Sequence, residues 1–206
     1  MSKKIYVTGI GTDVGKTVVS AIVTEALNAD YWKPIQAGDI TFGDTDKVKD
    51  LISNKTTVFH PNTYLLMTPM SPHAAAEIDN VTIDVSTITL PKTDNTIVIE
   101  GAGGLLVPLN DSETILDTID KSYKVILVSR HYLGSINHTL MSLKILMDKG
   151  HDVSVIFNGT ENKTSEDIIT KMTGVKVIGR IDEEPNLSKQ TISRYARIFK
   201  KTLQNI

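Results

Sequence analysis

The residues with the clearest chemical meaning lie between positions 7 and 17, where the sequence reads Val-Thr-Gly-Ile-Gly-Thr-Asp-Val-Gly-Lys-Thr. A glycine-rich loop that ends in Gly-Lys-Thr at a helix start leaves backbone N–H groups unpaired, and such groups bind phosphate oxygens. Lys16 would add a positive charge for the β- and γ-phosphates, and Thr17 would offer a hydroxyl to Mg²⁺. The stretch predicts a phosphate-binding P-loop, the alternative being a turn that only joins a strand to a helix.

A second group of charged residues is predicted at the ends of two strands. Residues 31–38 read as a short strand that ends near Pro34, which would place Lys33 at a carboxyl end, where ligands of open α/β sheets bind. Residues 96–100 are a β-branched run that ends in Glu100 and opens into Gly101-Ala102-Gly103-Gly104. Glu100 there suits a carboxylate that faces a metal beside a phosphate. The alternatives are a solvated surface lysine and a strand-end glutamate in water.

Two aspartates precede a predicted helix that contains Val48, Leu51 and Ile52. An aspartate in this position is usually an N-cap, so we expect one of the pair to cap the helix and the other to face the site. We assign Asp46 to the metal and Asp44 to capping or to solvent.

The elements around these residues alternate between strand and helix. Residues 5–7 form an apolar strand before the P-loop, and apolar residues recur at helical spacing from Val18 to Leu27. Further strands are predicted at 124–129, 153–157 and 175–178, and helices from Ser71, Ser135, Ser165 and Thr191. Ser135 is a plausible N-cap, although Gly134-Ser135 at a helix start is also a general anion site. We expect one domain over residues 1–206, with the doubly wound, mostly parallel sheet of a P-loop NTPase and helices on both faces.

The composition restricts the partners. The chain has 206 residues, a formal net charge of −2, no cysteine and no basic block, so we expect no nucleic-acid partner, disulfide or thiolate metal site. No apolar run approaches the roughly 20 residues that a membrane span needs. Met-Ser-Lys-Lys leads directly into the first strand, unlike a signal peptide. We expect a soluble cytoplasmic protein with no membrane partner.

Six motifs, taken in order, resemble those of the dethiobiotin synthetases. They are Thr8-Gly9-x-x-Thr12-Asp13-Val14-Gly15-Lys16-Thr17, Lys33-Pro34-Ile35, Asp46 before a helix, Ser71-Pro72-His73, Glu100-Gly-Ala-Gly-Gly104 and Leu133-Gly134-x-Ile136-Asn137-His138. They cover the chain from residue 4 to about residue 158. The P-loop of that family also carries its first glycine one place early, as Gly9 is here.

The resemblance implies an ATP-dependent enzyme that forms the cyclic urea of dethiobiotin from 7,8-diaminononanoate and CO₂. A carbamate of one amine would attack the γ-phosphate, and the second amine would then close the ring and expel phosphate. Lys16 and Lys33 would act on the carbamate and γ-phosphate, and Thr17, Asp46 and Glu100 would hold Mg²⁺. The resemblance also implies a homodimer, in which the helix start at Gly134 to Asn137 of the partner subunit receives the substrate's carboxylate.

The remaining roles are implied by position. Substrate would contact Thr12, Asp13, Lys33, Ala37, Gly134, Ser135 and Asn137. ATP would contact Asp13, Val14, Gly15, Lys16, Thr17, Val18, Asp46, Glu100, Gly101, Ala102, Gly103, Asn158, Asp182, Glu183 and Glu184.

Three positions depart from the family's pattern. Asp13 stands where most members have Glu, and Ala37 where a Ser or Thr hydroxyl is usual. Residues 181–184 read Ile-Asp-Glu-Glu instead of beginning Ile-Pro. That loop and Asn158 would frame the nucleobase. These differences therefore bear most on which nucleobase the protein prefers.

Two other P-loop classes are alternatives. A switch ATPase of the septum-site or plasmid-partition type would use a second lysine five residues before Lys16, where this chain has Gly11. An amide-forming ligase acting on a large acid would need a glutaminase domain, for which 206 residues leave no room.

Overall fold

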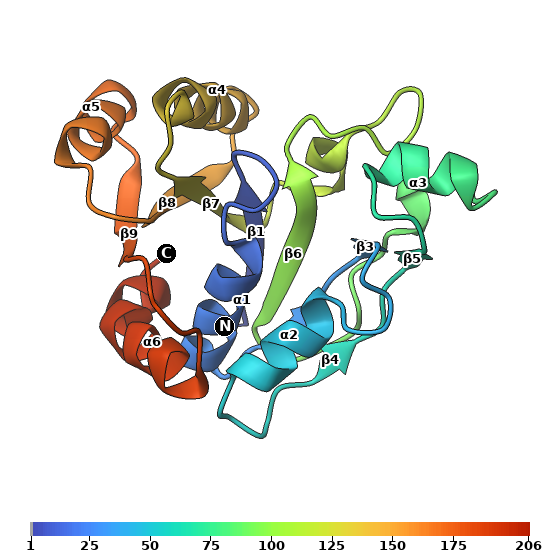
Figure 1. Cartoon of the computed structure of the whole chain (residues 1–206), viewed down its shortest axis with the longest axis horizontal. Helices are drawn as coiled ribbons and strands as arrows, with labels where there is room; N and C mark the ends of the chain where they lie inside the picture. The colour runs from blue at the N-terminus through green and yellow to red at the C-terminus, as the bar shows by residue number, and fades with distance from the viewer. Residues whose placement is uncertain (1) are drawn as a thin grey trace.

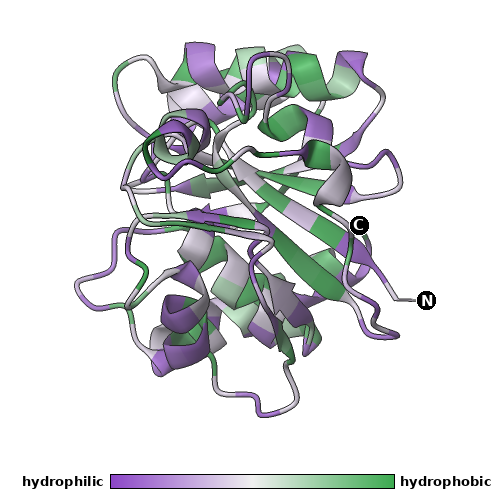
Figure 2. Ribbon diagram, turned by 90° about the vertical axis from the view of Figure 1, so that its right-hand side faces the viewer, coloured by the Kyte–Doolittle hydropathy of each residue, from purple (hydrophilic) through white to green (hydrophobic). Residues whose placement is uncertain are grey.

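The computed structural model describes residues 2–206, and its core is a seven-stranded parallel sheet with helices on both faces (Figures 1 and 2). The strand order is β4-β2-β6-β1-β7-β8-β9. These strands are β1 (Lys4–Gly9), β2 (Asp30–Trp32), β4 (Phe59–His60), β6 (Ile97–Gly104), β7 (Lys124–Arg130), β8 (Asp152–Asn158) and β9 (Lys176–Ile181). The predicted doubly wound parallel sheet is confirmed.

Apolar side chains of the helices cover the two faces of the sheet. Helices α1 (Lys16–Leu27), α2 (Asp44–Leu51) and α6 (Lys189–Gln204) pack against one face, around Val19, Ile22 and Phe199. Helices α4 (Ser135–Asp148) and α5 (Lys163–Thr173) pack against the other, around Leu143 and Ile169. Among the described residues, no helix combines the length and the apolar character required to span a bilayer.

A smaller layer stands beside the sheet on the β4 side and contributes one wall of the cleft described below. It contains the two-stranded parallel sheet of β3 (Ile35–Ala37) and β5 (Tyr64–Leu66), helix α3 (Pro72–Ile78), and the 3₁₀ turns η1 (Val85–Thr87) and η2 (Ile115–Thr118). Ile35, Leu66, Ala75 and Leu109 form its buried centre.

Two sequence predictions about these elements were wrong in detail, and one was incomplete. The strand predicted in residues 31–38 ends before Pro34 as expected, at Trp32, but the segment also contains a second strand, β3, which pairs with β5 instead of with the main sheet. Strand β6 does not end at Glu100 but continues to Gly104, so the glutamate lies inside the strand. Helix α4 is capped by Gly134, with φ of +102°, and Ser135 is its buried first residue without a side-chain cap bond.

Candidate active site

The P-loop connects β1 to α1 at the point where the chain order in the sheet reverses. Strand β1 lies between β6 and β7, and α1 crosses back toward β2. A loop at this position projects from the carboxyl edge of the sheet, where ligands of open α/β sheets bind. The predicted loop, strand and helix are therefore present in the arrangement that a phosphate site requires.

Two glycines of this loop are required by close contacts. A Cβ on Gly9 would lie 2.5 Å from Cγ2 of Val14, which explains why a glycine stands one position early. Gly15 has φ of +98°, and a Cβ there would lie 2.4 Å from Nδ2 of Asn158. The same Asn158 nitrogen donates to the carbonyl of Val14 at 2.8 Å, so Asn158 supports the loop from the end of β8.

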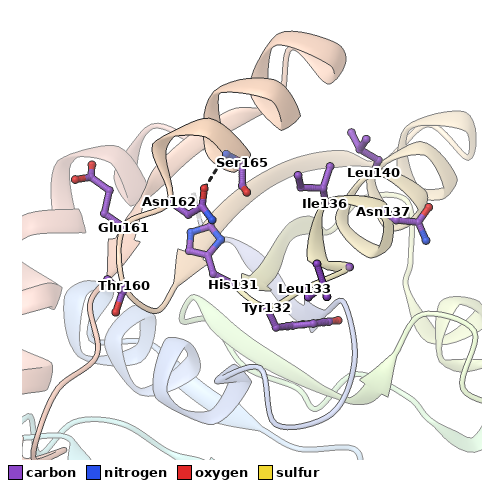
Figure 3. A pocket seen from close by; sticks show the side chains of 11 residues that line it. His131, Tyr132, Leu133, Ile136, Asn137, Leu140, Thr160, Glu161, Asn162 and Ser165 are labelled. Carbon is purple, nitrogen blue, oxygen red and sulfur yellow. Dashed lines mark hydrogen bonds between the residues drawn. The ribbon is translucent and has the colours of Figure 1, made fainter.

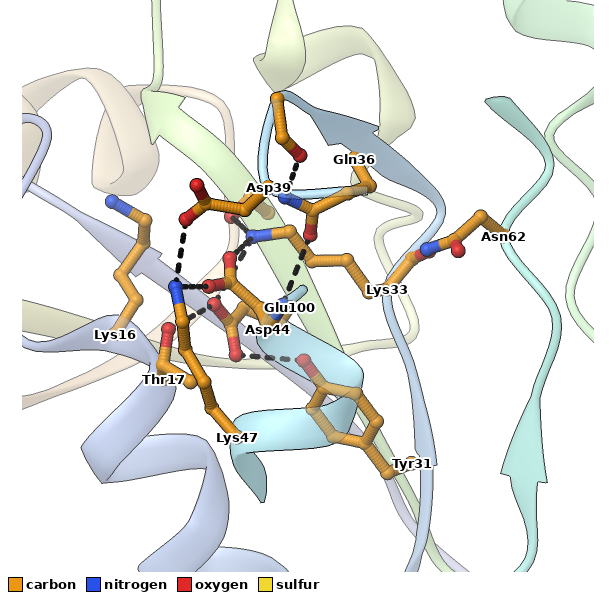
Figure 4. Close-up of polar contacts among 12 residues, drawn as sticks. Lys16, Thr17, Tyr31, Lys33, Gln36, Asp39, Asp44, Lys47, Asn62 and Glu100 are labelled. Atoms are coloured by element: carbon orange, nitrogen blue, oxygen red, sulfur yellow. Dashed lines mark hydrogen bonds and ion pairs between the residues drawn. The ribbon is translucent and has the colours of Figure 1, made fainter. Parts of the chain in front are cut away.

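The most buried charges of the site are Lys33 and Glu100 (Figure 4). Lys33 is 4% exposed and Glu100 is 1% exposed. Lys33 Nζ lies 3.1 Å from Glu100 Oε1 and 2.7 Å from Asp44 Oδ2, and it donates to the Gly101 carbonyl at 3.3 Å. The alternative that Lys33 is a solvated surface lysine is therefore wrong, and so is the alternative that Glu100 faces water.

Glu100 receives hydrogen bonds from three residues. Thr17 Oγ1 donates to Oε1 at 3.0 Å, next to Lys33, and the Tyr31 hydroxyl donates to Oε2 at 2.9 Å. Burial lowers the pKa of Lys33, but the charges of Glu100 and Asp44 outweigh this effect and leave that pKa above its ordinary value. The lysine is therefore a charged group inside the protein.

The contacts of the two aspartates at the start of α2 differ from those expected for the cap. The N-cap of α2 is Gly43, and Asp46, the third residue of the helix, accepts the Gly43 N–H through Oδ2 at 3.0 Å. Asp44 instead pairs through Oδ2 with Lys33 and through Oδ1 with Lys47, at 3.4 Å. The expectation that Asp44 caps or faces solvent is wrong, because its carboxylate is drawn to two lysines. Burial would raise the pKa of Asp44, and these lysines lower it below its usual range.

Lys16 is also largely buried and donates to the carbonyl of Gly11 at 2.8 Å. Burial, followed by the nearby charge of Lys33, lowers the pKa of Lys16 to about 8. A lysine with this pKa is partly neutral just above neutral pH, and an anion placed beside it would bring its proton back.

A cleft of about 740 Å³ brings most of the predicted residues together. The predicted residues that line it are Thr12, Asp13, Gly15, Lys16, Thr17, Val18, Lys33, Ala37, Glu100, Ala102 and Gly103. The cleft is also lined by residues that the sequence analysis did not assign to it, namely Asp44, Lys47, Gln36 and Ser71. Val14, Gly101, Asp46 and Asn158 lie next to lining residues but do not line the cleft themselves.

Residues 182–184 lie on the P-loop side of the sheet. Arg130 Nη1 donates to the carbonyl of Asp13 at 3.0 Å, and Arg130 Nη2 lies 3.9 Å from Glu183. Glu184 accepts from the Tyr195 hydroxyl at 2.6 Å, and Asp182 pairs with Arg180. The loop is thus fixed by its own ion pairs, and Arg130 links it to the P-loop.

The Gly134 to Asn137 helix start is elsewhere on the chain. It borders a separate hollow of about 830 Å³ between the first turns of α4 and α5, which shares no lining residue with the cleft (Figure 3). Gly134, Ile136 and Asn137 line this hollow, whereas Ser135 is buried behind them. In this chain, the predicted carboxylate site and the P-loop cleft are two different places.

Comparison with known proteins decides between the P-loop classes. Residues 3–191 match a family model described as an AAA domain. A protein of Christiangramia forsetii named ATP-dependent dethiobiotin synthetase BioD is 57% identical over 207 residues, covering 100% of both chains. A protein of the same name from Cytophaga hutchinsonii is 46% identical, covering 94% of this chain and 95% of the relative. The chain belongs to the dethiobiotin synthetase family.

Two solved structures with a similar fold are a cell division ATPase and a plasmid partition protein, the types named above as alternatives. The cell division ATPase MinD of Pyrococcus furiosus has a TM-score of 0.62 at 14% identity, covering 98% of this chain and 100% of its own. A plasmid partition protein of Borrelia burgdorferi has a TM-score of 0.60 at 16% identity, covering 100% and 99%. At this identity the likeness shows a shared P-loop fold alone, and membership of the dethiobiotin synthetase family rests on the sequence relatives.

Tyr31 and Lys47 are residues of the site that sequence reasoning missed. One signal could have found the tyrosine: Tyr31 and Lys33 are two positions apart on an extended segment, so their side chains point to one face. Both reach Glu100. No sequence signal identifies Lys47, because its role depends on how α2 is placed against the loop that carries Asp39.

Proposed function

We propose that this chain is a cytoplasmic dethiobiotin synthetase that uses ATP to close a cyclic urea from 7,8-diaminononanoate and CO₂. The observation that carries the proposal is the buried Lys33–Glu100 pair beside a P-loop, in a chain 57% identical to a protein of that name. The test is mass spectrometry of the product formed from diamine, bicarbonate, ATP and Mg²⁺. ATP turnover that ignores the diamine and gives no cyclic urea would favour a switch ATPase instead.

The residues of the cleft have distinct tasks in this reaction. The carbamate oxygen of the substrate attacks the γ-phosphate, ADP leaves, and the second amine then attacks the carbamate carbon and expels phosphate. Lys33 and Lys16 neutralise the charge that gathers on the carbamate and the phosphoryl group, while the P-loop amides hold the phosphates in line. Such chemistry depends on positioning and on fixed charge, and a nucleophilic side chain is not required.

Contacts near the reacting amines come from the walls of the cleft. Thr12 and Asp13 lie at the junction of diamine and phosphate. Ala37 offers no hydroxyl, and both polar atoms of the neighbouring Gln36 are already bonded, to Gly38 and Asp44. Thr12 and Ser71 supply hydroxyl groups at the cleft surface. Asn158 and residues 182–184 frame the nucleobase, supported by the links of Asn158 and Arg130 to the P-loop carbonyls.

Oxygen groups beside the P-loop fit a magnesium ion. Thr17 Oγ1 and Glu100 Oε1 are 3.0 Å apart at the cleft, and Mg²⁺ prefers such hard oxygen ligands together with phosphate oxygens. We assign Asp46 as the third protein ligand, because its Oδ1 makes no bond to residues 2–206 whereas both Asp44 oxygens are paired with lysines. When bound there, Mg²⁺ would supply positive charge that neutralises the phosphates of the nucleotide.

The two aspartates can be separated by their magnesium dependence. Asp46→Asn should raise the Mg²⁺ concentration for half-maximal rate by at least about tenfold, since loss of even an outer-shell partner costs that much. The free energy of unfolding should fall by less than about 1 kcal/mol, because the asparagine oxygen can still accept the Gly43 N–H. Asp44→Asn is the matched control and should leave the magnesium requirement within about twofold of wild type. A shift confined to Asp44→Asn would reverse the assignment.

The pKa of Lys16, about 8, makes nucleotide binding depend on pH. Phosphates beside the ammonium raise its pKa, so binding must take up protons where free Lys16 is partly neutral, and affinity should fall as pH rises above 8. Calorimetry at pH 8 in buffers of different ionisation enthalpy should show uptake of about half a proton per ADP. In Lys16→Arg the cation is always charged, and the uptake should vanish. No uptake in the wild-type protein would contradict this.

A homodimer is the arrangement that joins the cleft to the hollow at α4. Leu133 is fully exposed, and its chain neighbour Tyr132 is exposed as well. The exposed Leu106 and Met141 line a hollow together with His138, which Tyr132 contacts. Exposed apolar side chains of this kind are often buried at protein interfaces. With a partner on this surface, the first turn of the partner's α4 can offer its free N–H groups to a substrate carboxylate.

A further inference from the structure

The two oxygens of the Glu100 carboxylate have different partners. Oε1 accepts hydrogen bonds from Thr17 and Lys33, which both line the cleft. Among residues 2–206, Oε2 accepts a hydrogen bond only from the hydroxyl of Tyr31, which does not line the cleft (Figure 4). One oxygen therefore faces the groups that would handle phosphate and cation, while the other is held from behind.

Tyr31 is built into the core in a way that fixes its hydroxyl. It lies on β2, directly beside β6, with Tyr31 in register with Val98. Its side chain is 0% exposed, and its ring centroid is 5.9 Å from that of Phe59. Burial, with the charges of Glu100 and Asp44, raises its pKa well above the ordinary value, so it remains a neutral donor. A rigid ring with a protonated hydroxyl is suited to orient a carboxylate.

If the proposed function is correct, the hydrogen bond from Tyr31 to Glu100 becomes the main support of the carboxylate when substrates bind. Thr17 would turn its oxygen to the cation, and Lys33 would act on carbamate and γ-phosphate. Both partners of Oε1 would then have other tasks, and Tyr31 would be the remaining donor to Glu100 among residues 2–206. Carboxylates that bind metals are themselves held by hydrogen bonds, and loss of such a bond typically costs 10- to 100-fold in affinity or activity.

We propose that Tyr31 is a positioning residue, whose hydroxyl holds Glu100 by Oε2 so that Oε1 is presented to the catalytic cation. Tyr31→Phe keeps the buried ring and removes only the donor. It should raise the Mg²⁺ concentration needed for tight ADP binding by about tenfold, measured by calorimetry. It should also lower kcat by about tenfold, with the diamine KM within about twofold of wild type.

Tyr6→Phe is the matched control. Tyr6 is also a buried tyrosine, on β1, which like β2 pairs with β6. Its hydroxyl bonds to Thr118 Oγ1 at 2.8 Å instead of to Glu100. Both variants lose one buried hydrogen bond, so similar decreases in melting temperature are expected. Only Tyr31→Phe should change the magnesium dependence; equal changes in both variants, or no change in either, would overturn the proposal.

Two further measurements separate positioning from general damage. In a Glu100→Gln background, Tyr31→Phe should add no further loss of kcat, because the tyrosine acts through the carboxylate. An undiminished tenfold loss there would overturn the proposal.

If Tyr31→Phe does not fold, 3-fluorotyrosine at position 31 should show a ¹⁹F shift on addition of Mg²⁺ and ADP. The absence of a shift would overturn the positioning role of Tyr31. The measurement of ADP binding does not depend on the formation of dethiobiotin. A wild-type protein that binds Mg²⁺ and ADP but forms no dethiobiotin would therefore overturn only the proposed function.

Discussion

Lys33→Gln is expected to lower kcat/KM for dethiobiotin formation by at least about 10²-fold, comparable to removing a preorganised charge that stabilises a transition state. Glutamine keeps a hydrogen-bond donor, but its side chain is one atom shorter than that of lysine and has no charge for the carbamate or the phosphoryl group. The lysine is buried between Glu100 and Asp44, so water cannot replace the lost cation readily. Initial rates at varied diamine and ATP concentrations measure the loss.

The variant must be shown to fold, because breaking a buried ion pair can itself cost about 3–5 kcal/mol. ADP binding by calorimetry and thermal unfolding in the presence of ADP provide this check, since a folded P-loop should still bind nucleotide. Lys47→Gln is the matched control: it also removes a lysine paired with Asp44, but one that is half-buried at the mouth of the cleft. A Lys33→Gln enzyme within about threefold of wild type would show that the lysine has only a structural role.

The P-loop and the parallel sheet could be predicted because their signals are local. The apolar strand, the glycine loop and Gly15-Lys16-Thr17 are contiguous, and the backbone geometry of that stretch follows from its own residues. The lysine at the end of β2 could be placed near ligands by the general rule for open sheets, although its burial could not, because the carboxylates that pair with it lie on α2 and β6.

Other features depend on contacts between distant segments. Asp44 and Asp46 are equivalent as N-cap candidates by sequence, and only the position of Lys33 next to α2 distinguishes them. Ser135 has the right residue type for a cap, but the left-handed backbone at Gly134 takes that position and turns Ser135 inward. The roles of Tyr31 and Arg130 likewise require knowledge of which strands and loops are neighbours.

Mixing two inactive variants is expected to restore activity if each site is made from two subunits. One chain carries Lys33→Gln, which disables its cleft. The other carries Asn137→Glu, which places a negative charge on the first turn of α4, where the substrate's carboxylate is expected. In a two-fold dimer formed from one copy of each, one site combines the undamaged cleft with the undamaged helix start, and the other site carries both changes.

Random re-association of equal amounts should give about a quarter of the wild-type activity per mass of protein, since half the dimers are mixed and each has one intact site. Asn137 is a suitable position because its side chain is exposed, whereas a residue other than glycine at position 134 would be strained at φ of +102°. The dimer is shown by light scattering, and mixed dimers by two affinity tags purified in sequence. Activity no higher than that of either parent, in purified mixed dimers, would place the cleft and the carboxylate site on one chain, and the substrate would then have to be bound without the α4 helix of the partner.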